Sequence, residues 1–102
     1  LQWCDGSIAP GASLSRWEHR AYWGADNIAR GTNGTASRQR IGPLPAVGRW
    51  VRLEVPAAQV GLENRTVTGM ALLVYGERQL DLSWLTDILL VLQYQARTLY
   101  VL

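Results

Sequence analysis

Aromatic and planar polar side chains gather where one apolar segment ends and a polar segment begins. Arg20, Tyr22 and Trp23 are followed within four residues by Asp26 and Asn27. Indole and phenol rings offer flat apolar faces on which a sugar can stack, and guanidinium, carboxylate and amide groups hydrogen-bond hydroxyls. This spacing favours a carbohydrate-binding group. The alternative is that the rings fill the core of a small domain.

Trp50 is a second candidate for the same chemistry. It is in step with Arg52 and Glu54, so it shares the polar face of a predicted strand. The alternative is that this ring anchors a sheet edge or packs under a loop. The complete candidate ligand-binding set is Arg20, Tyr22, Trp23, Asp26, Asn27 and Trp50.

The sequence predicts no catalytic or metal site. Cys4 and His19 are the only soft metal ligands, and neither a phosphate-binding loop nor a nucleophile elbow occurs. Ser37, His19 and Asp26 are the residue types of a Ser-His-Asp catalytic triad, but their spacing in the sequence does not support one. A weak hydrolase would need His19 in a cleft beside an acidic partner. We expect a non-enzyme without cofactors; a structural calcium ion held by backbone carbonyls has no sequence signal.

The charges indicate which partners are absent. All ten basic residues are arginines, eight residues are acidic, and the formal net charge is +2. The arginines are dispersed, whereas a nucleic-acid-binding face is usually densely basic. No uninterrupted apolar run approaches the roughly 20 residues of a membrane-spanning helix. We therefore expect neither a nucleic-acid partner nor membrane insertion, and the single cysteine excludes an internal disulfide.

Segment 42–75 carries the clearest strand signals. Arg49–Val55 alternates apolar and polar residues, which is typical of a half-buried strand, and Pro56 is expected to end it. Thr66–Tyr75 is rich in β-branched and apolar residues and predicts a second strand, in which Gly69 marks a bulge or a close backbone approach. These two strands are expected to form the centre of the fold.

Weaker signals surround this centre. Segments 1–4 and 14–23 are expected to be strands, and either face of the second could be buried. Segment 24–42 predicts a polar loop with a short strand near 27–29, and such a loop could carry binding groups. A helical turn is expected at 57–60, with Gly61 as its stop.

The tail, 77–102, is atypical and apolar. Residues 92–98 alternate as a strand would, while leucines from Leu82 to Leu99 also form a helical stripe. We favour a strand because the rest of the chain reads as β. The predicted fold then depends on whether 88–102 can pair beside Thr66–Tyr75.

Four ordered motifs carry a family resemblance: His19–Gly24, Thr35–Arg38, Leu44–Pro56 and Val60–Ala71. They resemble modules beside RHS/YD-repeat regions of large bacterial surface and secreted proteins, and similar stretches of planctomycete-type multidomain proteins. The resemblance implies a jelly-roll or lectin-like sandwich, similar to carbohydrate-binding modules, with a non-catalytic accessory role. It also implies an extracellular or cell-surface location, although the sequence itself carries no signal peptide.

Two features depart from the family pattern. Segment 8–16 intervenes like an insertion, and the tail replaces a usual final strand. The chain starts at Leu1 rather than Met, which reads as a module excised from a larger protein. We predict one all-β module over 1–102, an antiparallel, jelly-roll-like β-sandwich. Its expected partners are glycans and the other domains of its parent protein; the alternative is a structural or protein-interaction spacer without a small ligand.

Overall fold

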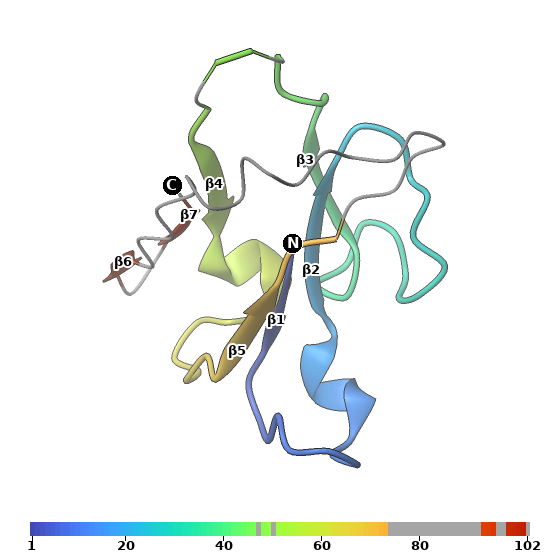
Figure 1. Ribbon diagram of the computed structural model, residues 1–102, viewed down its shortest axis with the longest axis vertical. Helices are drawn as coiled ribbons and strands as arrows, with labels where there is room; N and C mark the ends of the chain where they lie inside the picture. Colours follow the sequence, from blue (N-terminus) through green and yellow to red (C-terminus); the bar gives the residue numbers. More distant parts are fainter. Residues whose placement is uncertain (47, 50, 74–92, 96–97, 102) are drawn as a thin grey trace.

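The computed structural model describes residues 1–46, 48–49, 51–73, 93–95 and 98–101. Strands make up most of the regular secondary structure, and helix is limited to two short 3-10 turns (Figure 1). The elements are β1 (Gln2–Cys4), η1 (Leu14–Trp17), β2 (His19–Trp23), β3 (Gln39–Gly42), β4 (Leu53–Pro56), η2 (Ala57–Val60), β5 (Gly69–Ala71), β6 (Gln93–Gln95) and β7 (Thr98–Val101). The expected strand-rich class is confirmed at this level. No helix in these segments is long and apolar enough to cross a membrane.

The strands form two hydrogen-bonded sheets. One has the order β3-β2-β1-β5, and the other has the order β4-β7-β6. β1 is antiparallel to both β2 and β5, but β2 and β3 are parallel. The expectation of purely antiparallel pairing is therefore wrong at β2–β3. Parallel neighbours need a long crossover, and segment 24–38 supplies it.

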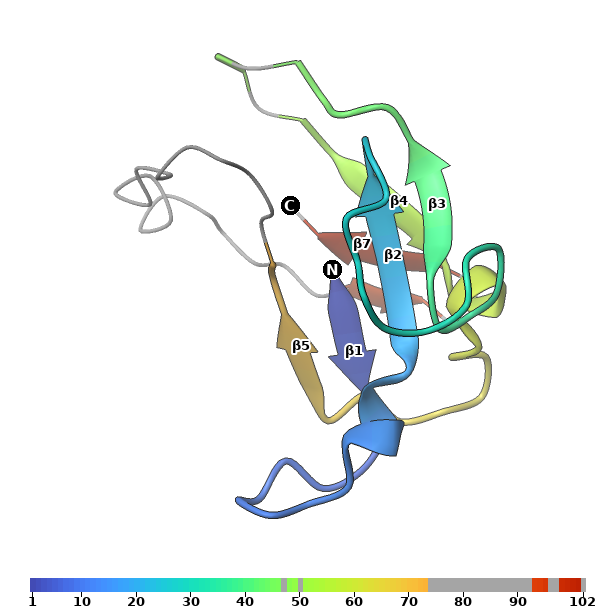
Figure 2. The same cartoon turned by 90° about the vertical axis from the view of Figure 1, so that its right-hand side faces the viewer.

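Alternate residues of β2 serve two different environments. Ala21 is fully buried in the core together with Trp3 of β1. Arg20 and Tyr22 hydrogen-bond to loop 24–38 instead. Figure 2 shows this loop running alongside β2 and β3. Both faces of this strand are therefore covered, which explains why the sequence pattern did not identify a single buried face.

The core forms where β4 and η2 meet β1 and β2. Its buried members are Leu1, Trp3, Ala21, Val55, Ala57, Val60 and Leu62. The predicted helical turn at 57–60 and its stop at Gly61 are both confirmed, since Gly61 has a left-handed backbone and its N–H donates to the Ala57 and Ala58 carbonyls of η2. This turn brings Val60 back under the sheet directly after β4 ends.

The two predicted central strands are short and lie in different sheets. β4 begins only at Leu53, and Val51 is 39% exposed. Only 69–71 of the second segment forms a strand, β5, which pairs with β1. Residues 74–75 lie outside the described residues. The bulge or close backbone approach predicted at Gly69 is not seen: a Cβ there would lie 3.1 Å from Ile8 Cγ2, so the atoms nearest to this glycine belong to side chains.

The described part of the tail is strand. β7 pairs with β4 and with β6, in antiparallel registers. The strand interpretation of the tail is thus confirmed for 93–95 and 98–101, while residues 77–92 lie outside the described residues. The expected partner is wrong, because β7 adds to β4 rather than to β5.

Two local predictions fail for identifiable reasons. The strand predicted over 14–23 begins only at His19, because its first residues form η1. The Ser13 hydroxyl caps this turn by accepting a hydrogen bond from the Ser15 N–H. The short strand predicted at 27–29 is absent, and β3 is the strand that follows the polar loop.

Gly31 provides a test of how tightly loop 24–38 folds on itself. Gly31 has φ +77° and a Cβ there would lie 2.6 Å from Ser37 O, whereas Gly34 has φ +81° and open space around it. A left-handed backbone costs either alanine variant roughly 1–2 kcal/mol. We expect Gly31→Ala to lose more unfolding free energy than Gly34→Ala because it alone adds a backbone clash. Urea denaturation measures both losses, and equal values would contradict this packing.

Candidate functional site

A hollow of about 170 Å³ opens beside the end of β2. We call it the Trp23 hollow. Its described lining consists of Leu1, Arg20, Tyr22, Trp23, Ala25, Asn27, Ile28, Leu44 and Leu73. Four of the six candidate ligand-binding residues therefore converge on one surface feature: Arg20, Tyr22, Trp23 and Asn27.

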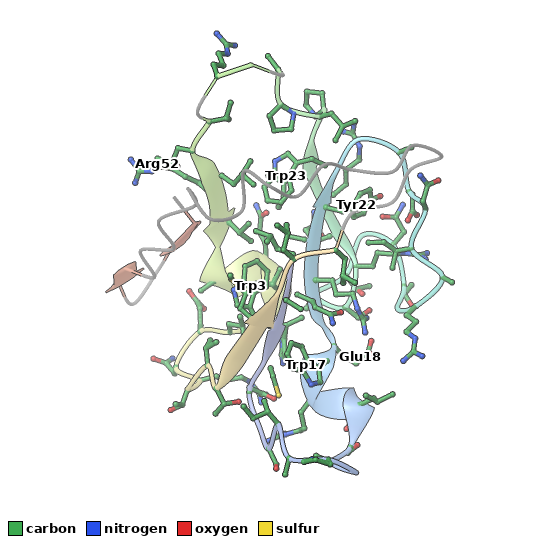
Figure 3. All side chains as sticks on the ribbon, viewed as in Figure 1. Trp3, Trp17, Glu18, Tyr22, Trp23 and Arg52 are labelled. Carbon is green, nitrogen blue, oxygen red and sulfur yellow. The ribbon has the colours of Figure 1, made fainter. Side chains whose placement is uncertain are left out.

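Trp23 and Asn27 are the accessible members of this group. Trp23 is half-buried and packs partly against the core, while Asn27 is exposed and its N–H bonds to Ala25 O. Tyr22 is buried, and its hydroxyl donates to Asn33 Oδ1 at 2.9 Å. Figure 3 shows the two aromatic rings at the same end of β2, on its two sides. Trp23 thus offers ring surface, and Tyr22 holds the loop.

Arg20 forms part of the wall rather than a free donor. The residue is only 5% exposed, and its guanidinium binds both Glu18 carboxylate oxygens, at 2.8 and 2.9 Å. Its remaining contacts are with Gln2 Oε1 and Ser37 O. The hydrogen bonds from Arg20 lower the pKa of Glu18 against the effect of burial, and nearby positive charge adds to this. Such a bidentate pair is strong and rigid.

Two candidate residues lie elsewhere. Asp26 does not line the hollow; its Oδ2 lies 3.6 Å from Arg38 Nε. Arg38 also donates to the Ile28 carbonyl, so Asp26 helps to fix the loop that carries Asn27. Trp50 lies outside the described residues.

A second hollow, of about 360 Å³, lies next to the first. We call it the Arg30 hollow. Its described lining consists of Gln2, Leu14, Trp17, Arg20, Ile28, Ala29, Arg30 and Leu73. Sequence reasoning misses this site because its lining comes from four separate segments. The one available signal is the polar loop 24–42, which contributes residues to both hollows.

The acidic partner of His19 is Asp5, whereas the triad considered from the sequence used Asp26. His19 Nε2 lies 3.4 Å from Asp5 Oδ2, and Nδ1 lies 2.6 Å from Val60 O. A carbonyl oxygen only accepts, so Nδ1 carries a hydrogen in this contact. His19 lines neither hollow, and Ser37 hydrogen-bonds within its own loop. The Ser37–His19–Asp26 arrangement is therefore not assembled.

The Asp5 carboxylate is the centre of a charged cluster. Its side chain is 4% exposed; Arg65 Nη1 lies 2.7 Å from Oδ2 and Arg16 Nε lies 3.4 Å from Oδ1. Burial raises the pKa of Asp5. The hydrogen bond from Arg65 and the charges of Arg16, His19 and Arg65 outweigh burial, so the pKa falls below its ordinary value of 3.8.

Neither a search for metal sites nor a comparison with known proteins indicates a function. Within the segments that the structure describes, no three His, Cys, Asp or Glu side chains are grouped so that they could hold a metal ion. No family model, curated protein or solved structure matches the chain. The resemblance to bacterial RHS-associated modules therefore stays a prediction.

The Asp5 cluster predicts acid sensitivity. A carboxyl whose pKa is lowered by folding stabilises the fold fully above its ordinary pKa, and this stabilisation is lost as the pH falls through the lowered value. We expect Asp5→Asn to lower the free energy of unfolding by about 1–3 kcal/mol at pH 7. The substitution removes the buried negative charge with which Arg16, His19 and Arg65 interact. We also expect the variant to lose less stability than the wild type below pH ~4.

Urea denaturation at pH 7 and at pH ~3 measures both effects. Some acid sensitivity remains in the variant, because folding also lowers the pKa of Glu18. Glu63→Gln is the matched control, since Glu63 is an exposed carboxylate. If Asp5→Asn behaves like Glu63→Gln, the cluster does not stabilise the fold.

Proposed function

We propose that this chain is a non-catalytic binding module whose ligand is a carbohydrate bound in the Trp23 hollow. The observation that carries the proposal is the half-buried ring of Trp23 beside the exposed amide of Asn27. An aromatic face with a nearby planar polar group is what a pyranose ring needs. The apolar C–H face stacks on the indole, and the hydroxyls hydrogen-bond to the amide.

The surroundings of Trp23 favour a pre-formed site. The Tyr22 hydroxyl is engaged by Asn33, and Arg20 is engaged by Glu18, so neither side chain must reorganise when a ligand enters. Rigid walls lower the entropic cost of binding. The Asn27 amide has two donors and one acceptor oxygen, which suits neighbouring hydroxyls that act as both.

The wider context of the proposal comes from the resemblance. The motif His19–Gly24 supplies Arg20, Tyr22 and Trp23 to the hollow, so one of the four motifs coincides with the candidate site. We assign the chain to a jelly-roll-like β-sandwich within a larger extracellular or cell-surface bacterial protein. The presence of two separate sheets is compatible with such a sandwich.

A spacer or protein-interaction module is the second candidate. The observation that favours it is the set of exposed large apolar side chains, among them Leu44 at 73%, Ile8 at 62% and Leu14 at 60%. Exposed apolar surface often marks contact with another protein domain. This function needs no small ligand, so the same binding experiment separates the two candidates.

The test is binding of the purified chain and a Trp23→Ala variant to a glycan array. We expect the wild type to bind a restricted set of glycans, and Trp23→Ala to lose about tenfold or more in affinity. Loss of one stacked aromatic ring removes on the order of 1.4 kcal/mol. Trp23→Phe keeps an aromatic face and should retain most of the binding.

Met70→Ala is the matched control for the lost side chain. Met70 is also half-buried and packs against the core as Trp23 does, but it lines neither hollow. Asn27→Ala and Gln59→Ala form a second pair, because both amides are exposed and only Asn27 lines the hollow. Equal binding to every glycan, or equal effects within each pair, would favour the spacer instead.

A further inference from the structure

The Arg30 hollow differs from the Trp23 hollow in its polar chemistry. Arg30 is exposed, and within the described residues it makes neither a hydrogen bond nor an ion pair. Its charge acts on Glu18 and helps to lower the pKa of that carboxyl, but the side chain that pairs with Glu18 is Arg20. A guanidinium has five donors, so Arg30 has donors to spare for a ligand.

Gln2 adds a second donor to the same wall. Its Oε1 accepts from Arg20 Nε at 3.1 Å, which fixes the orientation of the amide because Nε can only donate. The Gln2 amide nitrogen is therefore the group that remains available. No acidic side chain is among the described residues that line the Arg30 hollow. The polar groups there are donors, so a matching occupant must be rich in acceptors.

The charge of this region points the same way. Residues 18–42 contain four arginines, at positions 20, 30, 38 and 40, and two carboxylates, at 18 and 26. Four positive charges minus two negative charges give +2, which equals the formal net charge of the whole chain. The positive excess is thus concentrated in the strand and loop that line the hollows.

The two hollows adjoin each other. Arg20, Ile28 and Leu73 line both of them. The larger one, at about 360 Å³, falls in the range of roughly 300–1,000 Å³ that is common for small-molecule sites. It also has an apolar side, formed by Leu14 and the half-buried ring of Trp17. A chain-like ligand with one unit in the Trp23 hollow could therefore place the next unit in the Arg30 hollow.

We propose that the Arg30 hollow is a subsite for an acidic sugar unit, whose carboxylate pairs with Arg30 while its ring lies against Trp17. This assignment rests on the proposed function, since the Trp23 hollow holds the neighbouring unit of the same saccharide. A uronic or sialic acid has the required anionic group on a ring with hydroxyls. Guanidinium and carboxylate match in shape and charge, and they can form two parallel hydrogen bonds.

The decisive probe is an array of uronate- and sialate-containing oligosaccharides, each printed beside its methyl ester. Esterification removes the charge and keeps the sugar ring. At low salt we expect the wild type to bind an acid at least about tenfold more tightly than its ester. A tenfold difference in affinity is about what one hydrogen bond to a charged group contributes. This preference should shrink as salt rises, because exposed charges are screened.

Arg30→Gln should abolish the preference for the acid, so that the acid and its ester bind equally. Arg49→Gln is the matched control, since Arg49 is also exposed and lines neither hollow. Urea denaturation checks that both variants keep the stability of the wild type. An equal loss in the two variants would mean that net charge alone attracts the acid, and it would overturn the subsite.

The remaining outcomes separate the subsite from the proposed function. Binding that depends on Trp23 but ignores the carboxylate overturns the subsite alone. Binding to no glycan overturns both. Tighter, Arg30-dependent binding of an oligo-glutamate peptide than of any acidic sugar would assign the hollow to an acidic protein segment and overturn the sugar.

Discussion

The Asp5 carboxylate is the constraint on which the arrangement of the first sheet depends. It follows β1 directly, and its partners come from η1, from β2 and from the connector before β5: Arg16, His19 and Arg65. His19 extends the linkage to the Val60 carbonyl at the end of η2. A largely buried carboxylate needs such partners, because an unpaired charge in a protein interior is very costly. One acidic side chain therefore ties together segments that are up to 60 residues apart in sequence.

On the opposite face of β2 the buried charge is positive, and it too is held by partners from several segments. Arg20 is the buried charge there, and Glu18, Gln2 and Ser37 satisfy it. Because the Ser37 carbonyl belongs to loop 24–38, the same guanidinium that anchors β1 to β2 also anchors the loop. Arg20 lines both hollows, so the wall that they share includes a charged group whose partners hold it in place.

Sequence patterns predicted the parts of the fold that local spacing determines. A short apolar segment indicated β1, the period of two located β2 and the buried half of β4, and Gly61 marked the end of η2. The parallel β2–β3 pair and the choice of β4 as the partner of β7 were not predictable, since period-two patterns do not specify a neighbour. The same limit applies to the site. Residues close in sequence to Trp23 were found, whereas Gln2, Trp17 and Arg30 come together only through the folded backbone.

Arg20 and Arg30 show why residue type alone is a poor guide to a ligand site. Both line the Arg30 hollow, and only Arg20 was predicted to bind a ligand. Glu18 could have indicated the structural role of Arg20, because residues two apart in an extended segment share a face and their charges are opposite. An arginine that holds the fold must have its donors satisfied by the protein itself. An arginine that binds an anion must keep donors free, and among the described residues that line the hollows this condition is met by Arg30.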